Sequence, residues 1–236
     1  MTRYKRVLLK ITGELFVKKG EMGIDFDEVK KVASYLAHLR NVHQTELAIV
    51  LGGGNLFRGR NVRDDKFDRT QADFIGMLGT IMNGLALQGE LNTLGVQSRV
   101  MSSLYVNQAC EPYIRLRAIH HIEKGNIVIL VGGTGKPFFT TDTTAALLAA
   151  EMNCEILLKG SSVDGVYSAD PRQNKDATKY SSLSFQEALT QGLMVMDDTA
   201  FTVCKREKIP IIVFNVEDME NIERILNGET IGTIVS

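Results

Sequence analysis

The stretch "NIVILVGGTGKPFFTTDTTAALLAAEM", residues 126–152, contains an apolar run, a loop rich in glycines and hydroxyls, and a helical pattern. The run 126–131 has apolar side chains on successive residues, which is typical of a parallel strand covered on both faces. The loop resembles a phosphate-binding loop. It fails the G-x-x-x-x-G-K-[ST] pattern, however, because Leu130 replaces the first glycine and Pro137 follows the lysine. The stretch therefore predicts one strand–helix unit with an anion-binding loop of another kind.

The same alternation of apolar runs and helical patterns continues along the whole chain. Further strands are expected at residues 6–11, 46–51, 96–101, 155–160 and 209–214. Helical patterns lie at 26–40, with Asp25 or Asp27 as N-cap, at 140–152, and at 216–228, where Gly228 serves as C-cap. Such alternation predicts an α/β fold: a three-layer αβα sandwich with a mostly parallel central sheet, formed by the single domain 1–236.

The composition excludes several classes of protein. Hydrophobic residues make up 44% of the 236 residues, which is ordinary for a globular chain and argues against disorder. Lys+Arg 27 against Asp+Glu 28 gives a net charge of −1, which argues against general binding of nucleic acid or anionic membranes. Three scattered cysteines without metal-site spacing indicate reduced, mostly buried thiols, and we expect neither a signal peptide nor a membrane span. We therefore expect a cytoplasmic protein.

One long segment, "DFIGMLGTIMNGLALQGELNTLG" at residues 73–95, is apolar around most of its circumference and has four glycines in its interior, Gly76, Gly79, Gly84 and Gly89. Each glycine inside a helix costs roughly 1 kcal/mol relative to alanine, so these glycines indicate close packing against another helix or backbone. Two interpretations stay open, a buried central helix and a helix at a subunit interface.

In an open parallel sheet, ligands bind at the carboxyl ends of the strands, and four of the expected loops there are rich in glycine or hydroxyls. Lys10 ends an otherwise apolar strand and is expensive to bury unless it meets an anion. The glycines 52–54 can converge their N–H groups on an anion beside Arg58. Asp142 and Asp197 each precede a helical pattern, so each is either an N-cap or a functional carboxylate; Thr140 and Thr141 can cap in place of Asp142.

No histidine lies at a suggestive spacing from a serine or cysteine, so the sequence argues against triad chemistry. Backbone nests, a few cations and a few aspartates without an evident nucleophile favour phosphoryl transfer, where catalysis is mostly positioning and charge stabilisation.

Six motifs make the chain resemble the bacterial uridylate (UMP) kinases of the amino acid kinase family. They are "YKRVLLKITGE", "GGGNLFRG", "GMLGTIMNGLA", "GTGKPFFTTDTTAA", "LLKGSSVDGVYSADP" and "VMDDTAF", in the family's order and spacing. The resemblance implies transfer of the γ-phosphate of MgATP to UMP, giving UDP and ADP in pyrimidine biosynthesis. It also implies an acceptor lobe (about residues 1–150), an ATP lobe (151–236), a homohexamer built as a trimer of dimers, and inhibition by UTP.

The resemblance also assigns residue roles. The catalytic residues would be Lys10, Asp142 and Asp197, with the two aspartates orienting Lys10 and helping to place Mg²⁺ on the ATP phosphates without direct protein ligation. ATP would contact Lys10, Ile11, Thr12, Gly13, Gly54, Arg58, Ser161, Tyr167 and Asp170. UMP would contact Gly53, Asp73, Thr134, Gly135, Lys136, Pro137, Phe138, Phe139, Thr140 and Thr141, with Asp73 at the ribose.

The chain departs from the family pattern at two motif positions. Thr12 replaces a more usual serine, and Lys136 stands where asparagine is common, which adds charge beside the acceptor loop. GTP activates many relatives at a basic site between subunits. Arg99 is kept there, but Gln88 and Asn126 stand where arginines are expected, so we predict weak or absent activation with Lys124 partly compensating. The alternatives are another amino acid kinase, acting on carbamate or acetylglutamate, and a uridine-nucleotide sensor without turnover.

Overall fold

The central sheet runs through the whole structure, a computed structural model that describes residues 3–58, 67–193 and 195–236. The described strands form one sheet in the order β4 (Glu111–Pro112), β3 (Ser98–Ser102), β5 (Ile127–Val131), β2 (Glu46–Leu51), β1 (Arg6–Ile11), β6 (Ile156–Ser161), β8 (Ile211–Asn215), β9 (Thr233–Val235) and β7 (Ser182–Leu183). All neighbouring strands are parallel except β8 and β9. The mostly parallel sheet expected from the apolar runs is thus confirmed.

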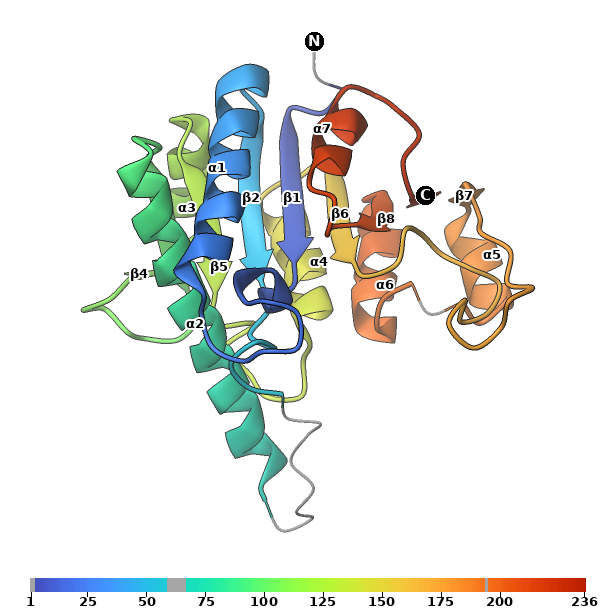
Figure 1. Ribbon diagram of the computed structural model, residues 1–236, viewed down its shortest axis with the longest axis horizontal. Coiled ribbons are helices and arrows are strands. Elements are labelled where there is room, and N and C mark those ends of the chain that lie inside the picture. The colour runs from blue at the N-terminus through green and yellow to red at the C-terminus, as the bar shows by residue number, and fades with distance from the viewer. Residues whose placement is uncertain (1–2, 59–66, 194) are drawn as a thin grey trace.

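Helices cover both faces of this sheet (Figure 1). Successive strand side chains point to opposite faces, so Val7 and Leu9 belong to one buried cluster and Leu8 to the other. The first cluster packs under α1 (Phe26–His43), α2 (Arg69–Thr93) and α7 (Glu220–Leu226). The second packs under α3 (Arg115–Glu123), α4 (Thr141–Glu151), α5 (Phe185–Thr190) and α6 (Asp198–Glu207). The fold is therefore the predicted three-layer αβα sandwich.

The order of the strands indicates at which edge of the sheet a ligand binds. From β1 the chain builds β2 and β5 on one side of the sheet, and later β6 and β8 on the other. In Figure 1 the arrows of β1, β2 and β6 all point toward the loops at the lower edge. Because β1 and β6 lie on either side of the reversal in strand order, their carboxyl ends form the topological switch point where such sheets bind ligands.

Most predicted elements agree with the structure to within two residues. The strands at 6–11 and 46–51 have the predicted bounds, and Asp25 caps α1 by accepting hydrogen bonds from the N–H groups of Asp27 and Glu28. Gly228 follows α7 with φ +90° and donates its N–H to the Ile225 carbonyl, as a helix-ending glycine does. The prediction missed β4, β7 and β9, which are two or three residues long.

The glycine-rich segment forms α2. One face of this helix is buried, as expected for a central helix, and the other face is exposed and apolar, as expected for a helix at a subunit interface. On the inner face, a Cβ at Gly84 would lie 2.6 Å from Val131, so the helix packs directly on β5. On the outer face, Phe74, Ile75, Leu78 and Met82 are 37–53% exposed. No helix of the described residues is both long and apolar enough to cross a bilayer.

Candidate active site

Two lysines and one aspartate form the centre of the site. Lys10 and Lys159 occupy opposite positions on the adjacent parallel strands β1 and β6, so their side chains leave the sheet side by side. The Lys10 Nζ lies 2.9 Å from Asp142 Oδ1, and the Lys159 Nζ lies 2.6 Å from Oδ2. All three side chains are only 13–16% exposed. One carboxylate therefore holds two ammonium groups at the switch point of the sheet.

The charges of this triad control its ionisation. Burial alone would raise the pKa of the Asp142 carboxyl, but the charges of Lys10 and Lys159 overcome burial and hold that pKa below its ordinary value. The pKa of the Lys159 ammonium is lowered, chiefly by burial and further by the charge of Lys10, against the opposing attraction of Asp142. The triad consequently carries one net positive charge when both lysines are protonated.

Asp142 is free for this role because Thr140 caps α4. The Thr140 hydroxyl accepts hydrogen bonds from the N–H groups of Asp142 and Thr143, which leaves the Asp142 carboxylate for the lysines. Asp197 does cap its helix: its carboxylate accepts from the Ala200 N–H at the start of α6 and from the hydroxyls of Thr140 and Thr143. Among the described residues Asp197 forms no ion pair with Lys10 or Lys159, so its contacts position α4 and α6 rather than Lys10 directly.

Two glycine loops meet beside the triad. A Cβ at Gly13, after β1, would lie 2.6 Å from the Gly52 carbonyl, and a Cβ at Gly52 would lie 3.2 Å from the Gly13 nitrogen. A Cβ at Gly53 would lie 2.7 Å from the Gly76 carbonyl on α2. Only glycine permits this spacing of three backbones, and the same lack of side chains lets a ligand phosphate approach the loops. Gly59, the last residue of the motif "GGGNLFRG", lies outside the described residues.

A cavity of about 870 Å³ opens on one side of these loops. Its lining includes four of the residues expected at ATP, Thr12, Gly54, Arg58 and Ser161. Arg58 donates to the Gly54 carbonyl and pairs with Glu14, which joins the two glycine loops by a charge contact.

The other residues expected at ATP lie differently. Ile11 is fully buried, so only its backbone can face a ligand. Tyr167 donates its hydroxyl to Asp164, and Asp170 accepts the Arg172 N–H in a turn. Neither Tyr167 nor Asp170 lines this cavity, where Ser162 and Arg172 take part instead.

A second cavity, of about 160 Å³, lies beside Gly53 and Gly54 and shares Gly54 with the first. It is lined by six of the residues expected at UMP, Gly53, Asp73, Lys136, Phe139, Thr140 and Thr141. Asp73 accepts a hydrogen bond from the Phe138 N–H at 2.8 Å, so the first turn of α2 holds the loop 134–141. Phe138 itself has φ +71° and lies under the guanidinium of Arg69 at 5.0 Å.

The remaining residues expected at UMP, Thr134, Gly135, Pro137 and Phe138, do not line this second cavity. Gly135 has φ +72°, and the Thr134 hydroxyl accepts the Lys136 N–H, so both shape the loop. The two cavities share Gly54; Lys10 lies two residues before Thr12 of the larger lining, and Asp142 directly follows Thr141 of the smaller one. Such an arrangement is suited to moving a phosphoryl group from one ligand to another.

Comparison with known proteins agrees with this geometry. Residues 5–215 match the profile of the family described as "Amino acid kinase family". The chain belongs to the amino acid kinase family. It is 48% identical over 233 residues to the uridylate kinase of Zymomonas mobilis subsp. mobilis (strain ATCC 31821 / ZM4 / CP4), which covers 99% of this chain and 96% of that protein.

Solved structures of the family share this fold. The crystal structure of UMP kinase from Bacillus anthracis superposes with a TM-score of 0.93 at 39% identity, covering 99% of this chain and 96% of that one. That of UMP kinase from Ureaplasma parvum gives 0.92 at 38% identity, covering 99% of both chains. The resemblance stated from the six motifs is thus confirmed.

Sequence reasoning missed one central residue of this amino acid kinase site, Lys159. Its signal was available, because a lysine ends the apolar run "ILL" just as Lys10 ends "VLL". It also missed Asn55 and Asn83, which are fully buried beside the glycine loops. Such amides give no signal of their own in a sequence, since their partners come from distant segments.

The donor set does not form a metal-binding cage. Among the described residues, no three His, Cys, Asp or Glu side chains converge in a way that could hold a metal ion. Asp142 is occupied by two lysines, and Asp197 by hydroxyls and an N–H. A Mg²⁺ ion needs only one or two protein carboxylates when phosphates and water supply the rest.

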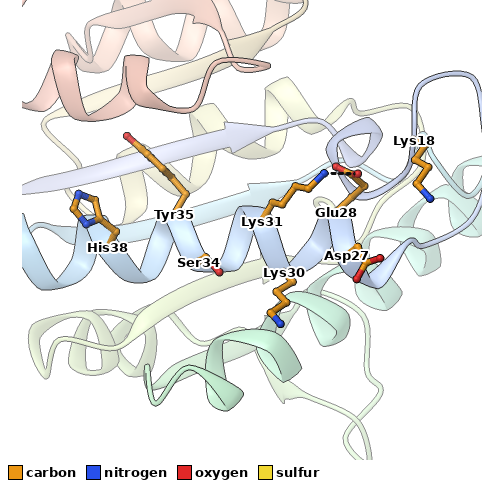
Figure 2. Close-up of a pocket in the computed structure, with 8 residues that line it drawn as sticks. All are labelled: Lys18, Asp27, Glu28, Lys30, Lys31, Ser34, Tyr35 and His38. Carbon is orange, nitrogen blue, oxygen red and sulfur yellow. Dashed lines mark hydrogen bonds and ion pairs between the residues drawn. The ribbon is translucent and has the colours of Figure 1, made fainter.

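Another hollow, of about 800 Å³, lies along the outer face of α1 and shares Lys18 and Glu28 with the larger cavity (Figure 2). Its side chains do not converge: Tyr35 and Lys30 point in opposite directions, and Lys31 is paired with Glu28. This open surface lacks the grouped donors of the two cavities described above, and we assign no ligand to it.

Proposed function

We propose that this amino acid kinase transfers the γ-phosphate of ATP to UMP, giving ADP and UDP, as a step of pyrimidine nucleotide biosynthesis. The observation that carries the proposal is the buried Lys10–Asp142–Lys159 triad at the switch point of the sheet, close in the chain to residues that line two cavities sharing Gly54. The linings include four of the residues expected at ATP and six of those expected at UMP. The names of the relatives, uridylate kinase and UMP kinase, support the choice of acceptor.

In this proposal ATP occupies the larger cavity, with its phosphates over Thr12, Gly13 and Gly54. Arg58 exchanges Glu14 for a phosphate, since an arginine pairs with either anion through its fork of N–H groups. Mg²⁺ bound to the ATP phosphates would be steadied near Asp142 and Asp197 and would supply charge neutralisation. Ser161 lies at the nucleoside side, and Tyr167 and Asp170 shape the loop beyond it.

UMP in the smaller cavity would place its phosphate toward Gly53 and its ribose at Asp73. The Asp73 carboxylate holds the Phe138 N–H, so it can accept a ribose hydroxyl while it keeps the loop 134–141 closed. Lys10 and Lys159 then stabilise the negative charge that develops on the transferred phosphoryl group. Asp142 fixes both ammonium groups before the substrates arrive, so little reorganisation remains for the chemical step.

The assembly and setting form part of the proposal. The exposed apolar face of α2 (Phe74, Ile75, Leu78 and Met82) fits an isologous contact with a second copy, within a homohexamer built as a trimer of dimers. We place the enzyme in the cytoplasm as a single domain with an acceptor lobe at about residues 1–150 and an ATP lobe at 151–236. UTP, which shares the uridine and carries more phosphates, should inhibit.

A panel of acceptors tests the proposal. ADP release is measured with MgATP and, in turn, UMP, dUMP, CMP, carbamate and acetylglutamate. We expect rapid turnover with UMP and at most weak turnover with dUMP, because a site that hydrogen-bonds a hydroxyl rejects analogues lacking it. We expect at most weak turnover with CMP as well, because the loop 134–141 would hold the uracil base. Equal turnover of CMP and UMP would refute the proposed selectivity, preference for carbamate or acetylglutamate would identify another amino acid kinase, and binding of UMP without ADP release would identify a sensor.

A further inference from the structure

Two buried asparagines form a reciprocal amide pair behind the glycine loops. Asn55, just after the triple glycine, is 1% exposed, and Asn83, in the middle of α2, is 0% exposed. The Asn55 Nδ2 donates to the Asn83 Oδ1 at 3.0 Å, and the Asn83 Nδ2 donates to the Asn55 Oδ1 at 2.7 Å. The two side chains thus join a loop and a helix that are 28 residues apart in the sequence.

The remaining N–H group of each amide holds a backbone carbonyl. Asn83 donates to the Gly52 carbonyl at 2.8 Å, and Asn55 donates to the Gly23 carbonyl at 2.8 Å. An asparagine side chain has two N–H donors, so all four donors of the pair are used, as burial requires. A fully satisfied buried network of this kind stabilises one arrangement of its partners, because any other arrangement would leave a buried polar group without a hydrogen bond.

The pair also packs against the loop after β1. A Cβ at Gly13 would collide with the Asn55 Oδ1 and would lie 2.8 Å from the Asn83 Nδ2. Gly13 therefore packs directly against the two amides, and Asn83 also holds the Gly52 carbonyl. One helical turn earlier, the Thr80 hydroxyl accepts the Gly132 N–H at 2.8 Å, at the start of the acceptor loop.

We infer that the Asn55–Asn83 pair is a positioning element of the reaction: it sets the spacing of the Gly13 and Gly52 loops and so aligns donor and acceptor phosphates. The inference rests on the proposed function, because it presumes that those loops hold the phosphates. Asn83 lines neither cavity, and Asn55, which borders the larger one, is 1% exposed and donates both of its N–H groups to acceptors within the protein. A misplacement of the loops affects the transition state more than the ground state, since in-line transfer depends on alignment and a shift of about 1 Å can cost about a hundredfold in rate.

The test uses Asn83→Ser and Asn55→Ser, which shorten each side chain without burying a charge, together with the double variant. The control is Leu87→Ala, one turn further along α2, where a fully buried side chain is truncated away from the glycine loops. Steady-state kcat and KM for ATP and UMP are measured well below the melting temperature of each variant, as set by circular dichroism.

We expect kcat to fall about ten- to one-hundredfold in both serine variants, with each KM within about threefold of the unaltered chain. The double variant should lose no more than the worse single variant, because both act through one contact. Leu87→Ala should lower the melting temperature and keep kcat. The inference is overturned if either serine variant keeps its kcat, or if Leu87→Ala loses as much. If the unaltered chain does not phosphorylate UMP, the proposed function itself is refuted, and the inferred role of the pair is refuted with it.

Discussion

Replacing Lys159 by methionine tests the centre of the site most directly. Methionine matches the length of the lysine stem but removes the ammonium group, whose Nζ lies 2.6 Å from Asp142 Oδ2 and 2.6 Å from the Val195 carbonyl. Removing one preorganised electrostatic donor from an active site costs about 10²–10³ in kcat, or about 2.7–4 kcal/mol. We expect a loss of this size in Lys159→Met, because the ammonium group is rigidly held beside the transfer point.

The stability of Lys159→Met should fall less than a broken buried ion pair usually implies. Removing one partner of such a pair costs about 3–5 kcal/mol when the other charge is left alone. Here Asp142 keeps Lys10 at 2.9 Å, so the remaining carboxylate is still compensated. We therefore expect a loss of about 3 kcal/mol or less in the free energy of unfolding.

The assay couples ADP release to a dye or NADH signal at saturating ATP and UMP, and urea denaturation gives the unfolding free energy. Lys175→Met, at an exposed lysine outside both cavities, serves as the matched control and should behave as the unaltered chain. A kcat for Lys159→Met within about threefold of the unaltered chain would contradict the role that we assign to this lysine, which needs at least the lower end of the expected range.

Three further predictions concern other parts of the site. Asp73→Asn should raise KM for UMP much more than it lowers kcat, because a ribose contact is made in ground and transition state alike; a pure kcat effect in initial rates would mean that the residue acts at the transfer point. The lowered pKa of Asp142 implies stability that is present above the unfolded-state value of 3.8 and lost as the pH falls through the lower folded-state value. The difference in unfolding free energy between the unaltered chain and Asp142→Asn should therefore stay constant above about pH 5 and shrink below pH 4, whereas a difference that grows on acidification would reverse the sign of the linkage. Millimolar GTP should raise the rate at saturating ATP and UMP little or not at all, because Arg99 already lies 3.8 Å from Glu111 and Gln88 supplies no charge; a several-fold rise would show that effector contacts lie elsewhere.

The layers and six main strands of the sheet could be predicted because apolar runs and helical periods are local signals. The short strands β4, β7 and β9 could not, since two or three residues acquire strand geometry only from the neighbours that pair with them. Asp142 is a second example. The sequence left open whether it is an N-cap or a functional carboxylate, and the structure shows that the Thr140 hydroxyl is the N-cap of α4.

Pairing register explains why Lys159 was missed and Lys10 was not. Each lysine ends an apolar run, but only the register between β1 and β6 places them opposite each other under one carboxylate. The Asn55–Asn83 pair depends in the same way on the packing of α2 against the loop after β2. Each motif could be identified in the sequence, but the contacts between motifs that are far apart in the chain could not be predicted from it.

The resting charges of the site suggest how it can favour the transition state over the ground state. Lys10 and Lys159 bring two positive charges to the single negative charge of Asp142, and Arg58 is balanced by Glu14. One positive charge at the triad thus lacks a partner among these groups until phosphates arrive. Because burial weakens the hold of Lys159 on its proton, an approaching anion stabilises the charged form, and the stabilisation grows as negative charge builds on the transferred group. Binding energy that increases along the reaction in this way raises kcat rather than merely lowering KM.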